Sequence, residues 1–278
     1  MKKLPLFILI SILLLSNFSN AQSFYPDVTH YEIHLDEINH TTKNIIATTK
    51  VNFTVHSNNT TQIDLSLEQF TIDNIQQNGQ SLAYTYNDTL IRINLNTPMN
   101  IGDTSTIQIS YHGITHTEAS GWGGFHVDAS YAFNMGVGFE TDPHNYGRCW
   151  YPCVETFTDK ATYEFFITTN FGKQAFCNGL LNGIVTNANN TLTYNWVMNQ
   201  PIPTYLASVA VGPYTTWQRI YQGLPVEIAC TIADSAAVSA SMIHLNDILG
   251  FYINAYGSYA FDKVGYCLVP FNAGAMEH

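Results

Sequence analysis

The sequence is poor in charge, and especially in positive charge. Only 11% of its 278 residues are charged, and ten Lys and Arg residues face 21 Asp and Glu residues, which gives a formal net charge of −11. No cluster of basic residues occurs after residue 3. Because such a surface would repel phosphate groups, neither nucleic acid nor anionic lipid is expected as a partner.

Long apolar runs are missing beyond the first residues. Lys2 and Lys3 precede a mostly apolar segment, residues 4–15, and small and polar residues then lead to Ala21. This order is typical of a cleavable signal, so residues 1–21 are predicted to direct export, and the mature protein is expected to be secreted or periplasmic. No later stretch approaches roughly 18 consecutive apolar residues, so no membrane span is expected once the signal is removed.

Cysteine is absent from the first half of the chain. The second half contains five, and an odd number leaves at least one unpaired within the chain. Cys149 and Cys153 have a spacing seen in zinc ribbons, but a ribbon needs a second such pair. We therefore expect buried thiols or one local disulfide rather than a metal site here.

Alternation of apolar and polar residues with a period of two dominates residues 28–226. It is clear in residues 31–36, 51–56, 91–95 and 107–111, and Asn-Gly and Gly-Asp pairs separate such runs. Alternation with this period indicates half-buried strands. Because no helical pattern lies between the runs, the sequence predicts antiparallel sheets packed as a β-sandwich.

Two segments depart from this alternation. Residues 115–148 are rich in Gly, His and aromatic residues, which is typical of a long, packed loop that often has a function. After residue 228 apolar residues recur every three or four positions, which predicts one amphipathic helix over residues 235–256, followed by a strand-like run at 264–270. These elements are too few to close a core alone, so we expect a second domain to begin after residue 217.

Several catalytic motifs are missing as well. The sequence has no nucleotide-binding loop, no Ser nucleophile elbow and no HExxH zinc motif. His112 and His116 lie four residues apart, but that spacing aligns two ligands on a helix, whereas this segment is predicted to be a strand followed by a turn. No zinc site built only from this chain is therefore expected.

The last residues carry a recognisable motif. Gly274-Ala-Met-Glu-His278 resembles the Gly-Ala-Met-Glu-Asn motif of the aminopeptidase N family of zinc aminopeptidases, with His in place of Asn. Upstream, residues 148–163 (RCWYPCVETFTDKATY) resemble the family's Arg-x-x-x-Pro-Cys signature, and residues 205–212 resemble the segment that precedes its catalytic domain. The resemblance covers nearly the whole chain after the predicted signal.

This resemblance implies a mainly β fold, in which a saddle-like antiparallel β-sandwich (residues 22–217) is followed by the incomplete start of a thermolysin-like α+β catalytic domain (residues 218–278). It also implies that Glu277 binds the free α-ammonium of a peptide substrate, because a carboxylate prefers that charged group to an internal amide. Gly274, Ala275 and Met276 would line the extended substrate.

Two departures from the family pattern matter. The family usually places a second amine-binding Glu or Gln where this chain has Pro143, so we expect Glu140 to substitute, with Asp142 and His144 next. The family's zinc ligands lie downstream of the motif, and this sequence ends before them. Zinc is therefore expected in the full-length family protein but not on this chain, which we predict to be inactive alone.

The leading hypothesis is thus the N-terminal part of a secreted zinc aminopeptidase that removes residues from peptides with free N-termini. The alternative, from another functional class, is a noncatalytic secreted β-sandwich module that binds peptides or proteins.

Overall fold

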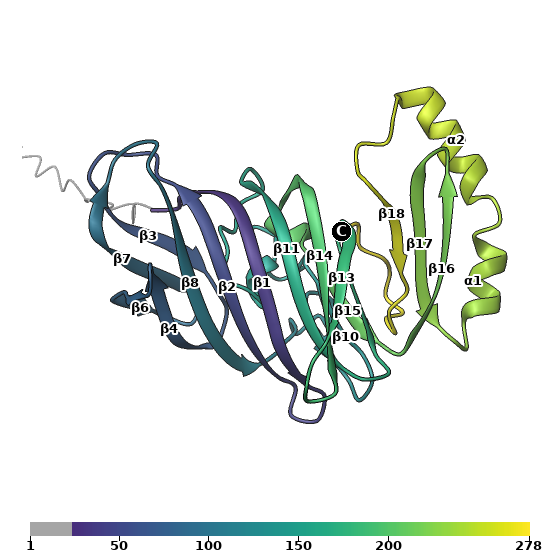
Figure 1. Cartoon of the computed structure of the whole chain (residues 1–278), viewed down its shortest axis with the longest axis horizontal. Coiled ribbons are helices and arrows are strands. Elements are labelled where there is room, and N and C mark those ends of the chain that lie inside the picture. Colours follow the sequence, from purple (N-terminus) through teal and green to yellow (C-terminus); the bar gives the residue numbers. More distant parts are fainter. Residues whose placement is uncertain (1–23) are drawn as a thin grey trace, which may run out of the picture.

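Eight strands form one large twisted sheet along the longer part of the molecule (Figure 1). The structure is a computed structural model that describes residues 24–278, and the predicted signal, residues 1–21, lies outside the described residues. In sheet order the strands are β13 (Leu180–Thr186), β14 (Thr191–Pro203), β11 (Lys160–Asn170), β1 (Asp27–Asn39), β2 (Asn44–Thr54), β8 (Thr104–Ile114), β4 (Thr71–Gln77) and β5 (Gln80–Ser81).

Two smaller sheets pack against the large one and complete the sandwich. The first consists of β12 (Gln174–Cys177), β15 (Val209–Gly212), β10 (Ala132–Met135) and β9 (Gly124–Val127). The second consists of β3 (Thr60–Ser66), β7 (Leu90–Met99) and β6 (Tyr84–Tyr86). Side chains from all three sheets, such as Tyr31, Ile91 and Phe133, belong to one hydrophobic core, so the predicted β-sandwich is confirmed.

The alternation in the sequence corresponds to the observed burial. In β11 the side chains of Ala161, Tyr163, Phe165 and Ile167 are buried, while those between them are more exposed. The period of two therefore places one face of each strand in the core. Tyr163 stacks on Tyr31 with ring centroids 5.2 Å apart, which locks β11 to β1.

The sequence predicts antiparallel sheets, but one strand pair in the large sheet is parallel. β1 pairs with β2 in an antiparallel hairpin but with β11 in parallel, where Ile33 lies opposite Phe165. A parallel pair needs a long crossover, and the chain between β1 and β11 supplies it by building most of the sandwich. Alternation within single strands contains no information about that pairing.

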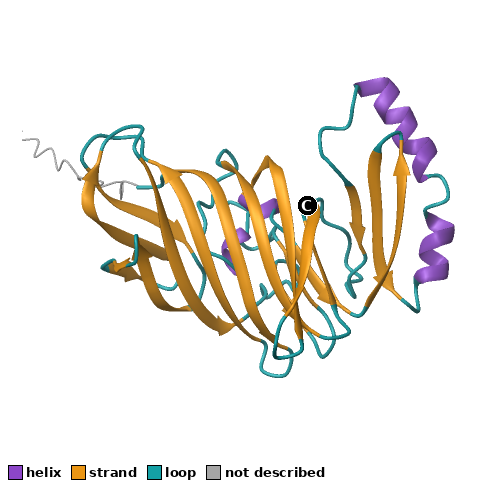
Figure 2. Ribbon diagram, in the orientation of Figure 1, coloured by secondary structure: helices purple, strands orange, loops and turns teal. Residues whose placement is uncertain are grey.

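A smaller unit follows the sandwich and has its own sheet, covered on one face by helices (Figure 2). Its strands are β16 (Tyr214–Tyr221), β17 (Leu224–Thr231) and β18 (Val264–Cys267), and β17 pairs in parallel with β18. A second hydrophobic core lies here, formed by Val226, Ile228, Cys230, Val238, Leu245, Leu249 and Val264. Tyr214 at the start of β16 belongs to the larger core, whereas Trp217 packs on the smaller one, and the predicted boundary at residue 217 stays a prediction.

The single helix predicted for residues 235–256 is wrong. Two helices occur instead, α1 (Ser235–Ser241) and α2 (Leu245–Tyr256), separated by a turn at residues 242–244. Val238 of α1 and Leu245 and Leu249 of α2 are all buried in the same core. The break between the helices therefore exposes little apolar surface, and the three- to four-residue spacing of apolar side chains continues from α1 into α2.

Taken as one stretch, residues 235–256 are long and apolar enough to cross a membrane, since they contain an 18-residue segment with a mean hydropathy of 1.2, of which 17% is buried. This finding departs from the expectation that no such stretch follows the signal. The 12 residues of α2 extend only about 18 Å, short of the roughly 30 Å of a bilayer core. Since helices that cover a protein core can have the same composition, the finding is weak evidence for membrane contact.

Candidate functional site

The segment that carries the terminal motif leaves β18 and runs back against the sandwich. Phe271 provides the contact, because its ring lies 5.3 Å from those of Trp122 and His126 and 6.1 Å from that of Phe133. Phe271 and Met276 are half-buried and pack on the larger core. Aromatic contacts of this kind hold the motif at the glycine-rich loop of residues 120–124.

Trp122 is the centre of this contact. A side chain at Gly274 would place its Cβ 2.8 Å from Trp122 Cη2, and Gly274 has a φ of +152°, so only glycine fits there without strain. The Phe139 ring lies 5.0 Å from the Trp122 ring on another side. The structure thus brings the terminal motif and the loop that contains Glu140 together at one indole.

The predicted amine-binding carboxylates are both exposed. Within residues 24–278, Glu277 makes no side-chain hydrogen bond or ion pair, so its charge is free to bind a ligand. Glu140 Oε2 accepts one hydrogen bond, from the backbone N–H of Ala119 at 3.2 Å. Asp142 and His144 are exposed on the same loop, and Ala275 lies exposed in the motif.

Glu118, which we had not predicted as a site residue, connects the two loops. Although it is only 8% exposed, its carboxylate accepts hydrogen bonds from four backbone N–H groups and one hydroxyl. The donors are Phe139 (2.9 Å), Glu140 (3.0 Å), Thr141 (3.2 Å), Gly123 (3.4 Å) and the Ser120 hydroxyl (3.0 Å). Burial would raise the pKa of Glu118, but these donors outweigh burial and lower the pKa below its usual value.

Glycine makes this close approach possible. A Cβ on Gly138 would lie 2.1 Å from Glu118 Oε1, and one on Gly123 would lie 2.7 Å from the Val137 carbonyl oxygen. The glycine pairs in the loops at 120–125 and 136–139 were visible in the sequence. They indicated a packed loop, but not which carboxylate it packs around.

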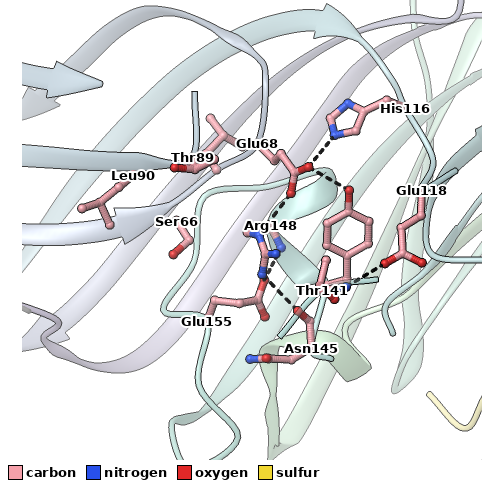
Figure 3. A network of polar contacts seen from close by, with 12 residues as sticks. Ser66, Glu68, Thr89, Leu90, His116, Glu118, Thr141, Asn145, Arg148 and Glu155 are labelled. Atoms are coloured by element: carbon pink, nitrogen blue, oxygen red, sulfur yellow. Dashed lines mark hydrogen bonds and ion pairs between the residues drawn. The ribbon is translucent and has the colours of Figure 1, made fainter. Parts of the chain in front are cut away.

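The signature arginine belongs to a polar network that Figure 3 draws together with Glu118 and Thr141. Arg148 donates to Glu68 at 3.1 Å and to the Asn145 carbonyl oxygen at 3.1 Å, and the Tyr146 hydroxyl donates to Glu68 at 3.0 Å. Burial would raise the pKa of Glu68, but His116, Tyr146 and Arg148 together lower it. The network fixes the loop that leads to the short 3-10 turn η1 (Gly147–Cys149).

Residues 149–155 of the signature are buried. Glu155 accepts hydrogen bonds from the Arg148 N–H at 2.6 Å and from the Thr204 hydroxyl at 3.1 Å, which joins the signature to the 3-10 turn η2 (Thr204–Leu206). Its pKa is raised by burial. Cys149 and Cys153 are buried free thiols, and burial raises the pKa of both. These buried residues therefore support the loops above them.

A cavity of about 290 Å³ adjoins the terminal segment at Phe271. Pro270 and Phe271 line it, together with Lys43, His116 and His126. The Nε2 atom of His126 lies 2.9 Å from the Trp122 carbonyl oxygen, and burial lowers the pKa of His126. Because a carbonyl oxygen can only accept, His126 Nε2–H donates to Trp122 and helps to hold the loop that carries the indole.

The described residues do not fit a zinc ion. Among residues 24–278, no three His, Cys, Asp or Glu side chains gather closely enough to hold a metal. His112 instead lies 2.9 Å from Asp73, and His116 lies 3.5 Å from Glu68. No chemical step can therefore be assigned to a metal held by these residues.

The sequence from residue 27 to residue 206 matches the peptidase M1 N-terminal domain, which is about two thirds of the chain. The chain belongs to the peptidase M1 family. Among curated relatives of this M1 chain, leucine aminopeptidase 2 of Vanderwaltozyma polyspora is 24% identical over 207 residues, which are 71% of this chain and 30% of that protein. The predicted resemblance to the aminopeptidase N family is thereby confirmed for the N-terminal portion.

Solved structures of an M1 zinc metallopeptidase from Deinococcus radiodurans share the fold of this M1 chain. One is superposed with a TM-score of 0.79 at 19% identity, covering 90% of this chain and 58% of that protein. A variant of the same enzyme, bound to a Tyr-Ser-Ala substrate, gives a TM-score of 0.79 at 20% identity with the same coverage. The chain thus spans between 30% and 58% of the length of these relatives.

Proposed function

We propose that this chain is the part of a secreted zinc aminopeptidase that recognises the free N-terminus of a peptide, with Glu277 as the amine-binding carboxylate. The observation that supports this most directly is that the Glu277 carboxylate is exposed and unpaired among the described residues. Glu277 also ends a segment held in place by Phe271 and Gly274. A fixed carboxylate without an internal partner is suited to bind an ammonium group.

Recognition of the N-terminus would explain removal of residues from the end of a peptide. A free α-ammonium can form a charge-assisted hydrogen bond with Glu277, whereas an acetylated N-terminus has no charge to offer. Glu140, which follows Phe139 at the Trp122 ring and accepts the Ala119 N–H, would be the second carboxylate. The relatives named above, a leucine aminopeptidase and a metallopeptidase with a bound tripeptide, support a peptide as the ligand.

The test is calorimetric titration of the chain with Tyr-Ser-Ala and with its N-acetylated form. We expect the free tripeptide to bind about 10-fold or more tightly than the acetylated one, since a hydrogen bond to a charged group contributes about 1.5–3 kcal/mol. Glu277→Gln should remove most of this difference, with the remainder due to Glu140, and should leave the affinity for the acetylated peptide unchanged. Glu37→Gln, at an exposed carboxylate on β1, is the matched control and should change neither affinity.

Equal affinity of the unaltered chain for the two peptides would refute this function. So would a Glu277→Gln variant that discriminates between them as strongly as the unaltered chain does. Hydrolysis by the longer enzyme is a separate part of the proposal, because it requires metal ligands that residues 24–278 do not supply.

We also propose that the protein is exported through a cleavable signal at residues 1–21. The order of two lysines, an apolar segment and small residues supports this proposal. Mass spectrometry of the protein from its own cells should give a mature N-terminus at Gln22, and an intact Met1 would refute cleavage.

A further inference from the structure

We propose that Glu118 is a positioning residue for ligand recognition, which acts by fixing the Glu140 carboxylate on the loop that carries Trp122. This inference rests on the proposed function, because it assigns a role to a residue that does not itself bind the peptide. It is drawn from the hydrogen bonds of one buried carboxylate and from the glycines packed around it.

The hydrogen bonds between the two loops are reciprocal. Glu118 accepts the backbone N–H of Glu140 at 3.0 Å, and Glu140 in turn accepts the backbone N–H of Ala119, the residue after Glu118, at 3.2 Å. Each acidic residue thus holds the backbone of the other's loop. As a result, the position of the Glu140 carboxylate depends directly on that of Glu118.

The same carboxylate also fixes Trp122. Glu118 accepts hydrogen bonds from the Ser120 hydroxyl at 3.0 Å and from the backbone N–H of Gly123 at 3.4 Å. The Ser120 oxygen in turn accepts one from the backbone N–H of Trp122 at 3.2 Å. These contacts shape the turn on which the indole stands. Since Trp122 touches both Gly274 and Phe139, the turn sets how far the terminal motif lies from the Glu140 loop.

Glu118 is itself prevented from binding a ligand. Its carboxylate is buried, and five donors within the chain surround it. Glutamine at this position would have the same size, but its amide nitrogen is a donor that would face other N–H donors. Glu118→Gln should therefore release the loop of residues 138–141 without changing any group that contacts the peptide.

A double-mutant cycle separates this role from simple stabilisation of the fold. The measured quantity is the ratio of the affinities for free and N-acetylated Tyr-Ser-Ala, in Glu118→Gln, Glu140→Gln and the double variant. We expect each single variant to lower the ratio about three- to tenfold. The double variant should have the same ratio as Glu140→Gln alone. The fall in thermal stability caused by Glu118→Gln should be the same in both backgrounds.

Gly138→Ala is a second variant that leaves every charge in place. Its Cβ would lie 2.1 Å from Glu118 Oε1 and displace the carboxylate, so it should lower the ratio as Glu118→Gln does. Gly183→Ala is the matched control, because a Cβ there has no atom within 4 Å, and the ratio should not change.

Two results would overturn the inference. One is a loss of stability in Glu118→Gln or Gly138→Ala with an unchanged affinity ratio. The other is a double variant in which Glu118→Gln lowers the ratio by its full factor even when Glu140 is already Gln. Failure of the proposed function would look different, because the unaltered chain would then bind both peptides equally or Glu277→Gln would have no effect.

Discussion

Lys263 links the smaller unit to the sandwich through a buried charge, and its loss should be severely destabilising. Its Nζ atom lies 3.2 Å from Glu227 Oε2 on β17 and donates to the Cys177 carbonyl oxygen at the end of β12, also at 3.2 Å. It also lies 4.1 Å from the centroid of the Trp196 ring on β14. The two charged side chains are only 11% and 10% exposed.

The substitution Lys263→Met keeps most of the apolar stem but removes the ammonium group. Glu227 would then be a buried carboxylate without a counter-charge, which typically costs about 3–5 kcal/mol. With a urea dependence of about 3 kcal/mol per M, this loss should lower the unfolding midpoint by 1 M or more. Urea unfolding followed by circular dichroism and tryptophan fluorescence measures it.

Lys50→Met is the matched control, because Lys50 also pairs with a carboxylate, Glu32 at 2.7 Å, but is 40% exposed. That variant should lose less than about 1 kcal/mol. Lys263→Met combined with Glu227→Gln should recover much of the loss, since no unpaired charge is then buried. Equal effects of the two lysine variants, or no recovery in the double variant, would refute this account of how the units are joined.

Two further stability effects follow from the structure. Burial and Asp27 raise the pKa of Asp159 to about 6, despite the hydrogen bond from Val28 N–H, so its ionisation lowers the stability of the fold by about 1 kcal/mol, after solvent screening, as pH rises from about 4 to 6. Asp159→Asn should remove this loss, which urea unfolding at pH 4.5 and pH 7 measures, and a variant with the same pH profile as the unaltered chain would contradict it. Gly138→Ala should lower the free energy of unfolding by about 1–3 kcal/mol, whereas Gly183→Ala should lower it by less than about 0.5 kcal/mol. Equal thermal midpoints of the two variants would show that the groups around the Glu118 carboxylate are not tightly packed.

The strands could be predicted from the sequence because each buries one face. Burial alternates along β2 and β11 as the apolar residues do, and that signal is local. The parallel pairing of β1 with β11 could not be predicted, because the two strands lie more than 100 residues apart and either direction buries the same side chains. The break between α1 and α2 escaped prediction for a similar reason, since Val238 and Leu245 face one core across it.

The site was predictable only where the sequence itself carries the motif. Gly274 and Glu277 were found by resemblance, and the structure adds that Phe271 and Trp122 hold the segment that contains them. Glu118 could not be found in this way. In the sequence, a carboxylate beside a glycine-rich loop cannot be told from a solvated one. Only the structure shows that the loop of residues 138–141 donates hydrogen bonds to it.

The different partners of three carboxylates explain which of them can bind an ammonium group. Glu118 is surrounded by five donors of its own chain, which lower its pKa and leave it no room for a ligand. Glu140 accepts one backbone N–H and keeps other lone pairs free, and Glu277 has no partner within residues 24–278. Since an ammonium group brings several donors at once, it gains most from the carboxylates with unused acceptors. This difference supports the proposal that Glu277 and Glu140 bind the ammonium group, while Glu118 holds the loop that keeps Glu140 in place.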